Sequence, residues 1–110
     1  MRVLFYAMGT RSPVEEFIRS QPAIVQATIA RGLDLIERYD LGAPGVSSRQ
    51  VRGKLWELRF RTGDAIRIFY VVHRQGEAEM ILLHGYKNRT QKTPPREIRT
   101  AERRMGEILR

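Results

Sequence analysis

Three apolar runs, separated by short polar turns, dominate the stretch from residue 54 to 89, KLWELRFRTGDAIRIFYVVHRQGEAEMILLHGYKNR. Strands joined by so few residues pair as antiparallel neighbours, because a parallel connection needs a crossover of about a dozen residues or more. The stretch therefore predicts strands over residues 55–61, 65–73 and 79–86, arranged as a meander. Turns are expected at Thr62-Gly63-Asp64 and Gln75-Gly76-Glu77.

Charged side chains recur inside these strands. A guanidinium group is charged at any physiological pH and is costly to bury unpaired, so strands built only for burial rarely carry several. Residues 55–61 alternate in character, which predicts one core face and one solvated face. The expected core face carries Trp56, Leu58 and Phe60, and the other face carries Leu55, Glu57, Arg59 and Arg61.

The remaining chain predicts one further strand and three helices. Residues 2–8 are rich in β-formers, and Ser12, Pro13 and Glu15 form a capping-box pattern that opens a helix over residues 13–19. A second helix is expected from Pro22 to about residue 39, and residues 41–53 have the composition of a loop. A last helix follows Pro95. The apolar stripes are Val25, Ile29, Leu33 and Ile36 in the second helix, and Ile98, Ala101, Met105 and Ile108 in the last.

The predicted order is βααβββα, an α+β class with a small, largely antiparallel four-stranded sheet packed by helices. With 110 residues, we expect a single domain over residues 1–110. No apolar run is long enough to span a membrane, and we expect a cytoplasmic location without membrane partners. The chain has no cysteine and only two histidines, so we expect no metal and no cofactor.

The basic charge is concentrated in the second half of the chain. Residues 1–49 carry six arginines against five acidic residues, whereas residues 50–110 carry fourteen Lys and Arg against seven acidic residues. Such an asymmetric distribution is typical of a protein that binds a polyanion, with nucleic acid the first candidate and an acidic protein the second. A solvated basic surface is the simpler alternative.

Three arginines are expected to converge on one site. Arg59 and Arg61 leave one strand on its polar side, and Arg67 lies on the next strand, where cross-strand Cβ atoms are about 5 Å apart. Guanidinium groups this close repel each other unless an anion lies between them. A phosphodiester fits, since arginine offers bidentate donors and can stabilise a charged transition state. The alternative is that Glu57 and Glu79 pair with these arginines structurally.

Aromatic and titratable residues interleave the cations. Tyr70 and Tyr86 can stack on an unpaired base, whereas Trp56 is expected in the core; for Tyr70 we expect a half-buried ring with a free hydroxyl. His84 has an ordinary pKa near neutrality and is a candidate for acid or base catalysis, although a structural role is the simpler reading. The candidate RNA contacts are Lys54, Arg61, Tyr86, Arg89 and Lys92.

The combination of LWELRF, IRIFY and LLHGYKNRTQKTP, followed by a helix containing AxxR, resembles the phage-derived HigB-like branch of the RelE/ParE toxin superfamily. The resemblance covers nearly the whole chain. It implies a type II toxin, a ribosome-dependent and metal-independent endoribonuclease that cleaves translated mRNA and inhibits translation. The implied partners are mRNA on the ribosome and a small antitoxin, commonly a helix-turn-helix protein encoded beside the toxin.

The resemblance also implies residue roles. Arg67 matches the family's strand arginine and would hold the scissile phosphate, and Arg59 falls where RelE has a catalytic lysine. Glu57 occupies the position of the other strand lysine of RelE, and the C-terminal tyrosine of RelE has no clear match. Arginine is a poor general base. We therefore expect Arg59 and Arg67 to stabilise charge, with Lys87 as a further cation. His84 or Glu57 is expected to transfer protons, and Tyr70 to shape the site.

Two other functions remain open from the sequence. A ParE-like toxin of the same fold would inhibit DNA gyrase and need no acid or base. A non-catalytic module that binds RNA or the ribosome would show a steep salt dependence and leave RNA intact.

Overall fold

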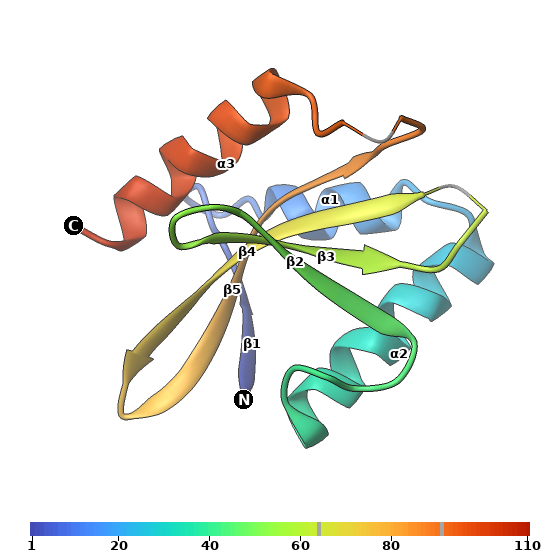
Figure 1. Cartoon of the computed structure of the whole chain (residues 1–110), viewed down its shortest axis with the longest axis horizontal. Helices are drawn as coiled ribbons and strands as arrows, with labels where there is room; N and C mark the ends of the chain where they lie inside the picture. The colour runs from blue at the N-terminus through green and yellow to red at the C-terminus, as the bar shows by residue number, and fades with distance from the viewer. Residues whose placement is uncertain (64, 91) are drawn as a thin grey trace.

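Five strands and three helices make up the fold in the computed structural model, which describes residues 1–63, 65–90 and 92–110 (Figure 1). The predicted α+β class is confirmed. The elements are β1 (Arg2–Phe5), α1 (Pro13–Arg19), α2 (Ala23–Tyr39), β2 (Val46–Arg52), β3 (Leu55–Phe60), β4 (Ile66–Gln75), β5 (Glu77–Lys87) and α3 (Pro95–Ile108).

The sheet has the strand order β1-β5-β4-β3-β2. Strands β3, β4 and β5 form the predicted antiparallel meander, and β4 is the central strand. β1 joins the outer edge of β5 in parallel, with Leu4 opposite Ile81. A bulge in the β4–β5 pair shifts the register between Phe69 and Tyr70, so that Phe69 lies opposite His84 and Tyr70 lies opposite Leu82.

Helices α1 and α2 cover one face of the sheet. The predicted stripe of α2 is buried, and it packs with Leu58, Ile68 and Leu82 in one hydrophobic cluster. Burying each such side chain contributes about 1.5–3 kcal/mol. Gly85 allows α1 to approach β5, because a Cβ at this position would lie 2.4 Å from the ring of Phe17. We call this side the α2 face.

Helix α3 covers the other face, which we call the α3 face. Its Ala101 is buried, and Ile98, Met105 and Ile108 pack against a second cluster that contains Leu55 and Phe69. The predicted apolar stripe of α3 is therefore confirmed. The expectation of a solvated face is wrong for most of β3, because Leu55 and Glu57 are fully buried. Conversely, Trp56, expected in the core, is 36% exposed, since α2 does not extend over that end of the sheet.

Two local predictions need correction. The segment predicted as a loop, residues 41–53, contains β2, an edge strand whose residues are mostly exposed and so lack apolar alternation. Ser12 does not cap α1 with its side chain, and Glu15 instead pairs with Arg19 at 3.1 Å. Pro13 does begin that helix, as predicted. The predicted turn at residues 62–64 lies partly outside the described residues.

None of the helices in the described part of the chain is long and apolar enough to cross a membrane.

Candidate functional site

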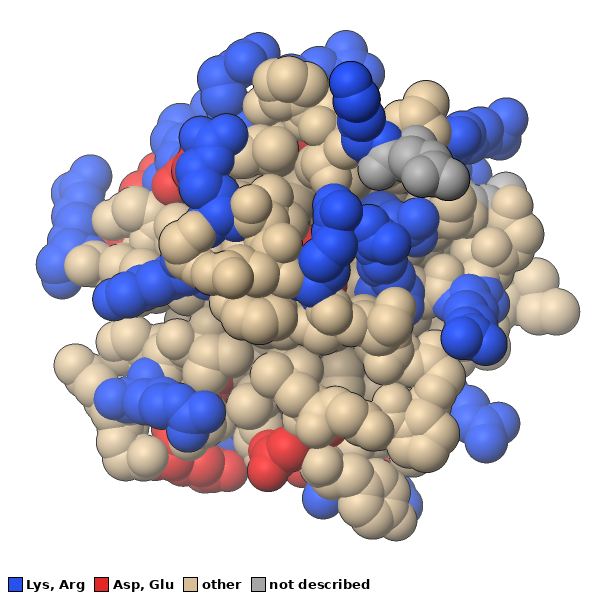
Figure 2. Space-filling view, in the orientation of Figure 1, with Lys and Arg blue, Asp and Glu red and all other residues tan. Residues whose placement is uncertain are grey.

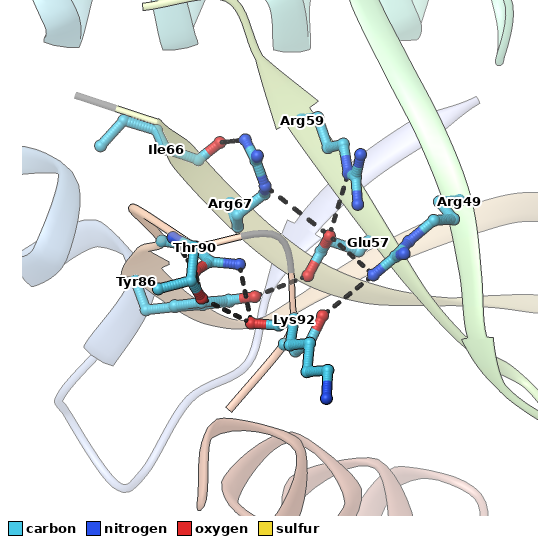
Figure 3. Close-up of polar contacts among 10 residues, drawn as sticks. Arg49, Glu57, Arg59, Ile66, Arg67, Tyr86, Thr90 and Lys92 are labelled. Atoms are coloured by element: carbon cyan, nitrogen blue, oxygen red, sulfur yellow. Dashed lines mark hydrogen bonds and ion pairs between the residues drawn. The ribbon is translucent and has the colours of Figure 1, made fainter. Parts of the chain in front are cut away.

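A buried carboxylate forms the centre of the site. Glu57 has no exposed surface, and its Oε1 lies 3.2 Å from Nε of Arg59 and 3.8 Å from nitrogen atoms of both Arg49 and Arg67. Its Oε2 accepts a 2.8 Å hydrogen bond from the hydroxyl of Tyr86. Figure 3 shows these side chains pointing toward Glu57 from four strands. We call Arg49, Glu57, Arg59, Arg67 and Tyr86 the arginine cluster.

Strand register explains the convergence. On the α3 face, Tyr86, Arg67 and Arg59 are consecutive cross-strand partners. The neighbouring row runs from His84 through Phe69 and Glu57 to Arg49. Like charges directly opposite each other destabilise a strand pair. Glu57, diagonal to Arg67, supplies the opposite charge that allows Arg59 and Arg67 to face each other.

The arginine cluster carries more positive than negative charge. Three guanidinium groups share one carboxylate among the described residues, and Arg67 Nε is buried without a hydrogen-bond partner there. The side chains of Arg49, Arg59 and Arg67 are 46%, 32% and 17% exposed, so an incoming ligand meets guanidinium groups before it meets Glu57. Such an arrangement is suited to an anion of phosphate type, because arginine can donate to two oxygens at once.

Tyr86 contributes its hydroxyl to the site but not its ring. The ring is buried and stacks on Phe69 with a centroid distance of 5.3 Å, so the predicted stacking of an RNA base on Tyr86 is wrong. Burial, and then the hydrogen bond to Glu57, raise the pKa of the phenol well above its ordinary value. Tyr86 therefore stays protonated and can donate a proton near the cluster.

His84 lies at the margin of the cluster. Its Nε2 is 3.2 Å from a carboxylate oxygen of Glu97 on α3, and Phe69 separates it from Glu57 in the row. Burial lowers the pKa of the imidazole, although the hydrogen bond to Glu97 acts in the opposite direction. The contacts thus direct His84 toward α3 and place it away from the carboxylate of Glu57.

Tyr70 does not share a face with the arginines. It is fully buried in the cluster on the α2 face, and its hydroxyl is hydrogen-bonded to Ser48. The prediction of a half-buried ring with a free hydroxyl is wrong, because regular alternation along β4 places Tyr70 with Ile68 and Val72 on the α2 face, where the ring is fully buried. Burial raises the pKa of its phenol. Lys54 is exposed and lines a hollow beside Trp56 and Tyr70, so it too lies apart from the cluster.

The loop before α3 brings further cations to the edge of the site. Asn88 is buried and organises this loop, accepting hydrogen bonds from the backbone and side chain of Thr90 and donating one to the carbonyl of Lys92. Lys87, Arg89 and Lys92 are exposed. Figure 3 shows Lys92 beside the arginine cluster. By strand alternation Lys87 leaves β5 on the face opposite Tyr86.

Arg61 is exposed just beyond the end of β3, so it is not part of the contacts around Glu57. Glu79, considered as a partner for the arginines, instead pairs with Arg2 at 3.3 Å. The site therefore contains two of the three predicted arginines.

Arg49 and Thr93 are members of the site that sequence reasoning missed. Arg49 donates a 2.9 Å hydrogen bond to Thr93 Oγ1, which joins β2 to the loop before α3. No periodic signal marks Arg49 in the sequence, because VSSRQVR lacks apolar alternation and the flanking glycines and proline are typical of a loop. Among the described residues, no group of three or more Asp, Glu or His side chains is placed to hold a metal ion.

Positive charge extends beyond the cluster. Figure 2 shows Lys and Arg side chains spread over the face that looks toward the viewer, with few Asp and Glu among them. The basic residues of the second half of the chain are spread from β2 through the following strands and the loop before α3 to α3 itself.

The family described as phage derived protein Gp49-like (DUF891) matches residues 16–106. This range includes every residue of the arginine cluster. Comparison with curated proteins gave no significant match.

Proposed function

This chain belongs to the phage-derived Gp49-like family, and from that premise we propose that it is the toxin of a type II toxin–antitoxin pair. In this proposal it is a ribosome-dependent endoribonuclease of the HigB-like branch of the RelE/ParE superfamily. Its partners are translated mRNA and a cognate antitoxin, a helix-turn-helix protein encoded beside it. The observation that carries the proposal is the excess of guanidinium groups around Glu57.

The arginines bind the scissile phosphate. Arg59 and Arg67 face each other across neighbouring strands, so one phosphodiester can receive donors from both. During cleavage the 2′-oxygen attacks phosphorus and the 5′-oxygen leaves, which places extra negative charge on the non-bridging oxygens. Fixed positive groups stabilise that charge more than they stabilise the ground state, and this difference lowers the barrier.

Proton transfer is assigned to Glu57 and Tyr86. Glu57 takes the proton of the 2′-hydroxyl, and Tyr86 gives its phenolic proton to the departing 5′-oxygen, leaving a 2′,3′-cyclic phosphate and a 5′-hydroxyl. The 2.8 Å hydrogen bond between the two groups then returns the proton from Glu57 to the phenolate. Glu57 is a better candidate than His84, because Glu57 contacts Arg59 and Arg67 directly, whereas the Nε2 of His84 is bonded to Glu97.

Primer extension on a translated mRNA bound to programmed ribosomes tests the proposal. The wild-type protein should produce cuts in phase with the codons, and Arg67→Ala should reduce cleavage by about 10²–10³-fold, the usual effect of removing one donor to a developing charge. Arg31→Ala is the matched control, because this exposed arginine lies on α2. Undiminished cleavage by Arg67→Ala would refute the role of the cluster, and intact transcripts with wild-type protein would refute the nuclease.

A further inference from the structure

One hollow of the described part of the molecule lies away from the arginine cluster. It has a volume of about 540 Å³. Residues of β3 and β4 line it, together with Lys54 before β3, Leu41 after α2 and Leu109 after α3. This volume is typical of sites that accept a ligand or an anchoring side chain. Its apolar lining consists of Leu41, Trp56, Tyr70, Val72 and Leu109. We call it the tryptophan groove.

Apart from Leu109, which packs with the cluster of the α3 face, the apolar strand residues of the tryptophan groove lie on the face of the sheet opposite the arginine cluster. Trp56 and Glu57 are consecutive residues of β3, so their side chains point in opposite directions. Tyr70 and Val72 belong to the hydrophobic cluster of the α2 face, whereas Tyr86 belongs to that of the α3 face. A partner in the groove can therefore bind without occupying the phosphate position.

The apolar surface of the groove is partly uncovered. Trp56 is 36% exposed and Leu41 is 40% exposed, although both are large apolar side chains. The hydroxyl of Tyr70, the polar group of the groove floor, is already bonded to Ser48. A nucleobase needs donors and acceptors on its edges to be recognised. The floor thus favours an apolar side chain over a base.

The polar lining of the groove carries positive charge through Lys54 and Arg74. It consists of Lys54, His73 and Arg74, and none of the described residues that line the groove is acidic. Two carboxylates close to the lining in sequence or register are engaged elsewhere. Asp40 pairs with the N-terminal amine at 3.1 Å, and Glu79, opposite His73, pairs with Arg2 at 3.3 Å.

From this complementarity we propose that the tryptophan groove docks an acidic amphipathic segment of a protein partner. One or two large apolar side chains of that segment fill the space beside Trp56, and flanking carboxylates pair with Lys54 and Arg74. Apolar anchors supply the binding energy, and the charges supply orientation and association rate. The inference goes beyond the proposed nuclease and does not depend on it.

Trp56 makes the test direct, because it is the single tryptophan of the chain and its fluorescence reports the groove. A pool of random peptides of about twelve residues, long enough for a short amphipathic segment, is selected against the immobilised protein. Recovered peptides are then titrated in solution while Trp56 emission is recorded. We expect them to be rich in Asp and Glu, to contain large apolar residues, and to change the emission of Trp56.

Charge reversal identifies the contacts. The double variant Lys54→Glu/Arg74→Glu should weaken peptide binding about tenfold or more, since two favourable pairs become repulsive. The variant Arg31→Glu/Arg99→Glu has the same net charge, changes exposed residues outside the groove lining, and should bind like wild type.

Several outcomes would overturn the inference. These are failure to enrich any peptide, recovery of neutral or basic peptides, unchanged Trp56 emission, or equal weakening by both double variants. A U-rich RNA dodecamer that displaces the peptides from wild-type protein, with the same dependence on Lys54 and Arg74, would assign the groove to RNA and refute the protein partner.

Discussion

At the scale of single residues, the site depends on the placement of one carboxylate. Arg59 and Arg67 are direct cross-strand neighbours, an arrangement that repels by itself. Glu57 contacts both arginines, and it also accepts a hydrogen bond from the hydroxyl of Tyr86. A buried charge with several partners is strongly destabilising to remove, because the remaining charges lose their compensation. The same residue thus compensates the charge of the two neighbouring arginines and, in our proposal, accepts a proton.

Glu57→Gln separates these two roles. Glutamine preserves the volume and the acceptor for Tyr86, but it removes the negative charge that competes with a phosphate for the arginines. We expect cleavage to fall by about 10²-fold or more, the loss expected when a general base is removed. Glu57→Gln should bind an RNA with a 2′-deoxy substitution at the cleaved position as tightly as the wild-type protein does, or more tightly.

The control is Glu77→Gln, which changes an exposed carboxylate at the first residue of β5. Thermal unfolding without RNA should show a lower midpoint for Glu57→Gln, since breaking a buried ion pair typically costs about 3–5 kcal/mol. If folded Glu57→Gln lost RNA binding and cleavage in equal proportion, Glu57 would be only a structural residue.

His84 links stability to pH. Its pKa is lowered in the folded protein, mainly by burial, so the unfolded chain binds more protons than the folded chain below the ordinary value of 6.5. The stabilising contribution is therefore fully present above about pH 6.5 and is lost as the pH falls through the folded pKa. Urea unfolding between pH 7 and pH 5 should show a steeper loss of stability for wild type than for His84→Gln. Parallel curves would contradict the assignment.

At the scale of elements, two close approaches determine how helices are placed on the sheet. Gly85 allows α1 to pack directly on β5. Gly32 in α2 faces Phe60 and Val46, and a Cβ at this position would lie 2.8 Å from a ring carbon of Phe60 and 2.8 Å from a methyl carbon of Val46. These glycines are needed for space, because their φ angles are not in the left-handed region. Residue size at these positions therefore controls the distance between the helical layer and the sheet.

Gly85→Ala should destabilise the protein. The added methyl group would lie 2.4 Å from Cδ2 of Phe17, so α1 must move, and overpacking of this kind typically costs about 1–3 kcal/mol. Gly106→Ala is the matched control, since nothing lies within 4 Å of its Cβ position in α3. In a helix, alanine is favoured over glycine by up to about 1 kcal/mol, so this variant should be neutral or slightly stabilised. Chemical unfolding of both variants tests the contact, and equal effects would refute it.

At the scale of the whole molecule, the net charge of +8 favours encounter with a polyanion. The charge is distributed over a broad surface, whereas the arginine cluster is one small part of it (Figure 2). Long-range attraction and local recognition can therefore be measured separately. Salt weakens both, but only a lost phosphate contact changes the number of ions released on binding.

Salt dependence of RNA binding should reflect this division. For a single-stranded RNA, the logarithm of the binding constant should fall linearly with the logarithm of the salt concentration. Each phosphate contact contributes about 0.7 to the magnitude of the slope. Arg67→Ala should reduce the slope by about that amount, and Arg31→Ala should leave it unchanged. Fluorescence anisotropy with a non-cleavable oligonucleotide at several salt concentrations provides the measurement. An unchanged slope for Arg67→Ala would mean that Arg67 does not contact phosphate.

The sequence by itself determined the elements that carry strong periodicity or clear boundary residues. Pro13 and Pro95 begin helices as predicted, and the stripes of α2 and α3 are packed against the sheet. The meander and the opposition of Arg59 and Arg67 followed from short turns and strand alternation. These features depend on local chain geometry, which a sequence pattern expresses directly.

Only the tertiary structure decided which side chains on each face of the sheet are buried and which residues they contact. Alternation placed Trp56 and Glu57 on opposite faces of β3, but Glu57 is fully buried among arginines and Tyr86, whereas Trp56 is 36% exposed. Arg49 reaches Glu57 because β2 pairs with β3, and this edge strand lacks an apolar pattern of its own. Tyr70 is buried on the face opposite the arginines, where its hydroxyl meets Ser48. Side-chain periodicity reports which residues share a face, whereas burial depends on how far the covering helices extend, which is set by long-range packing.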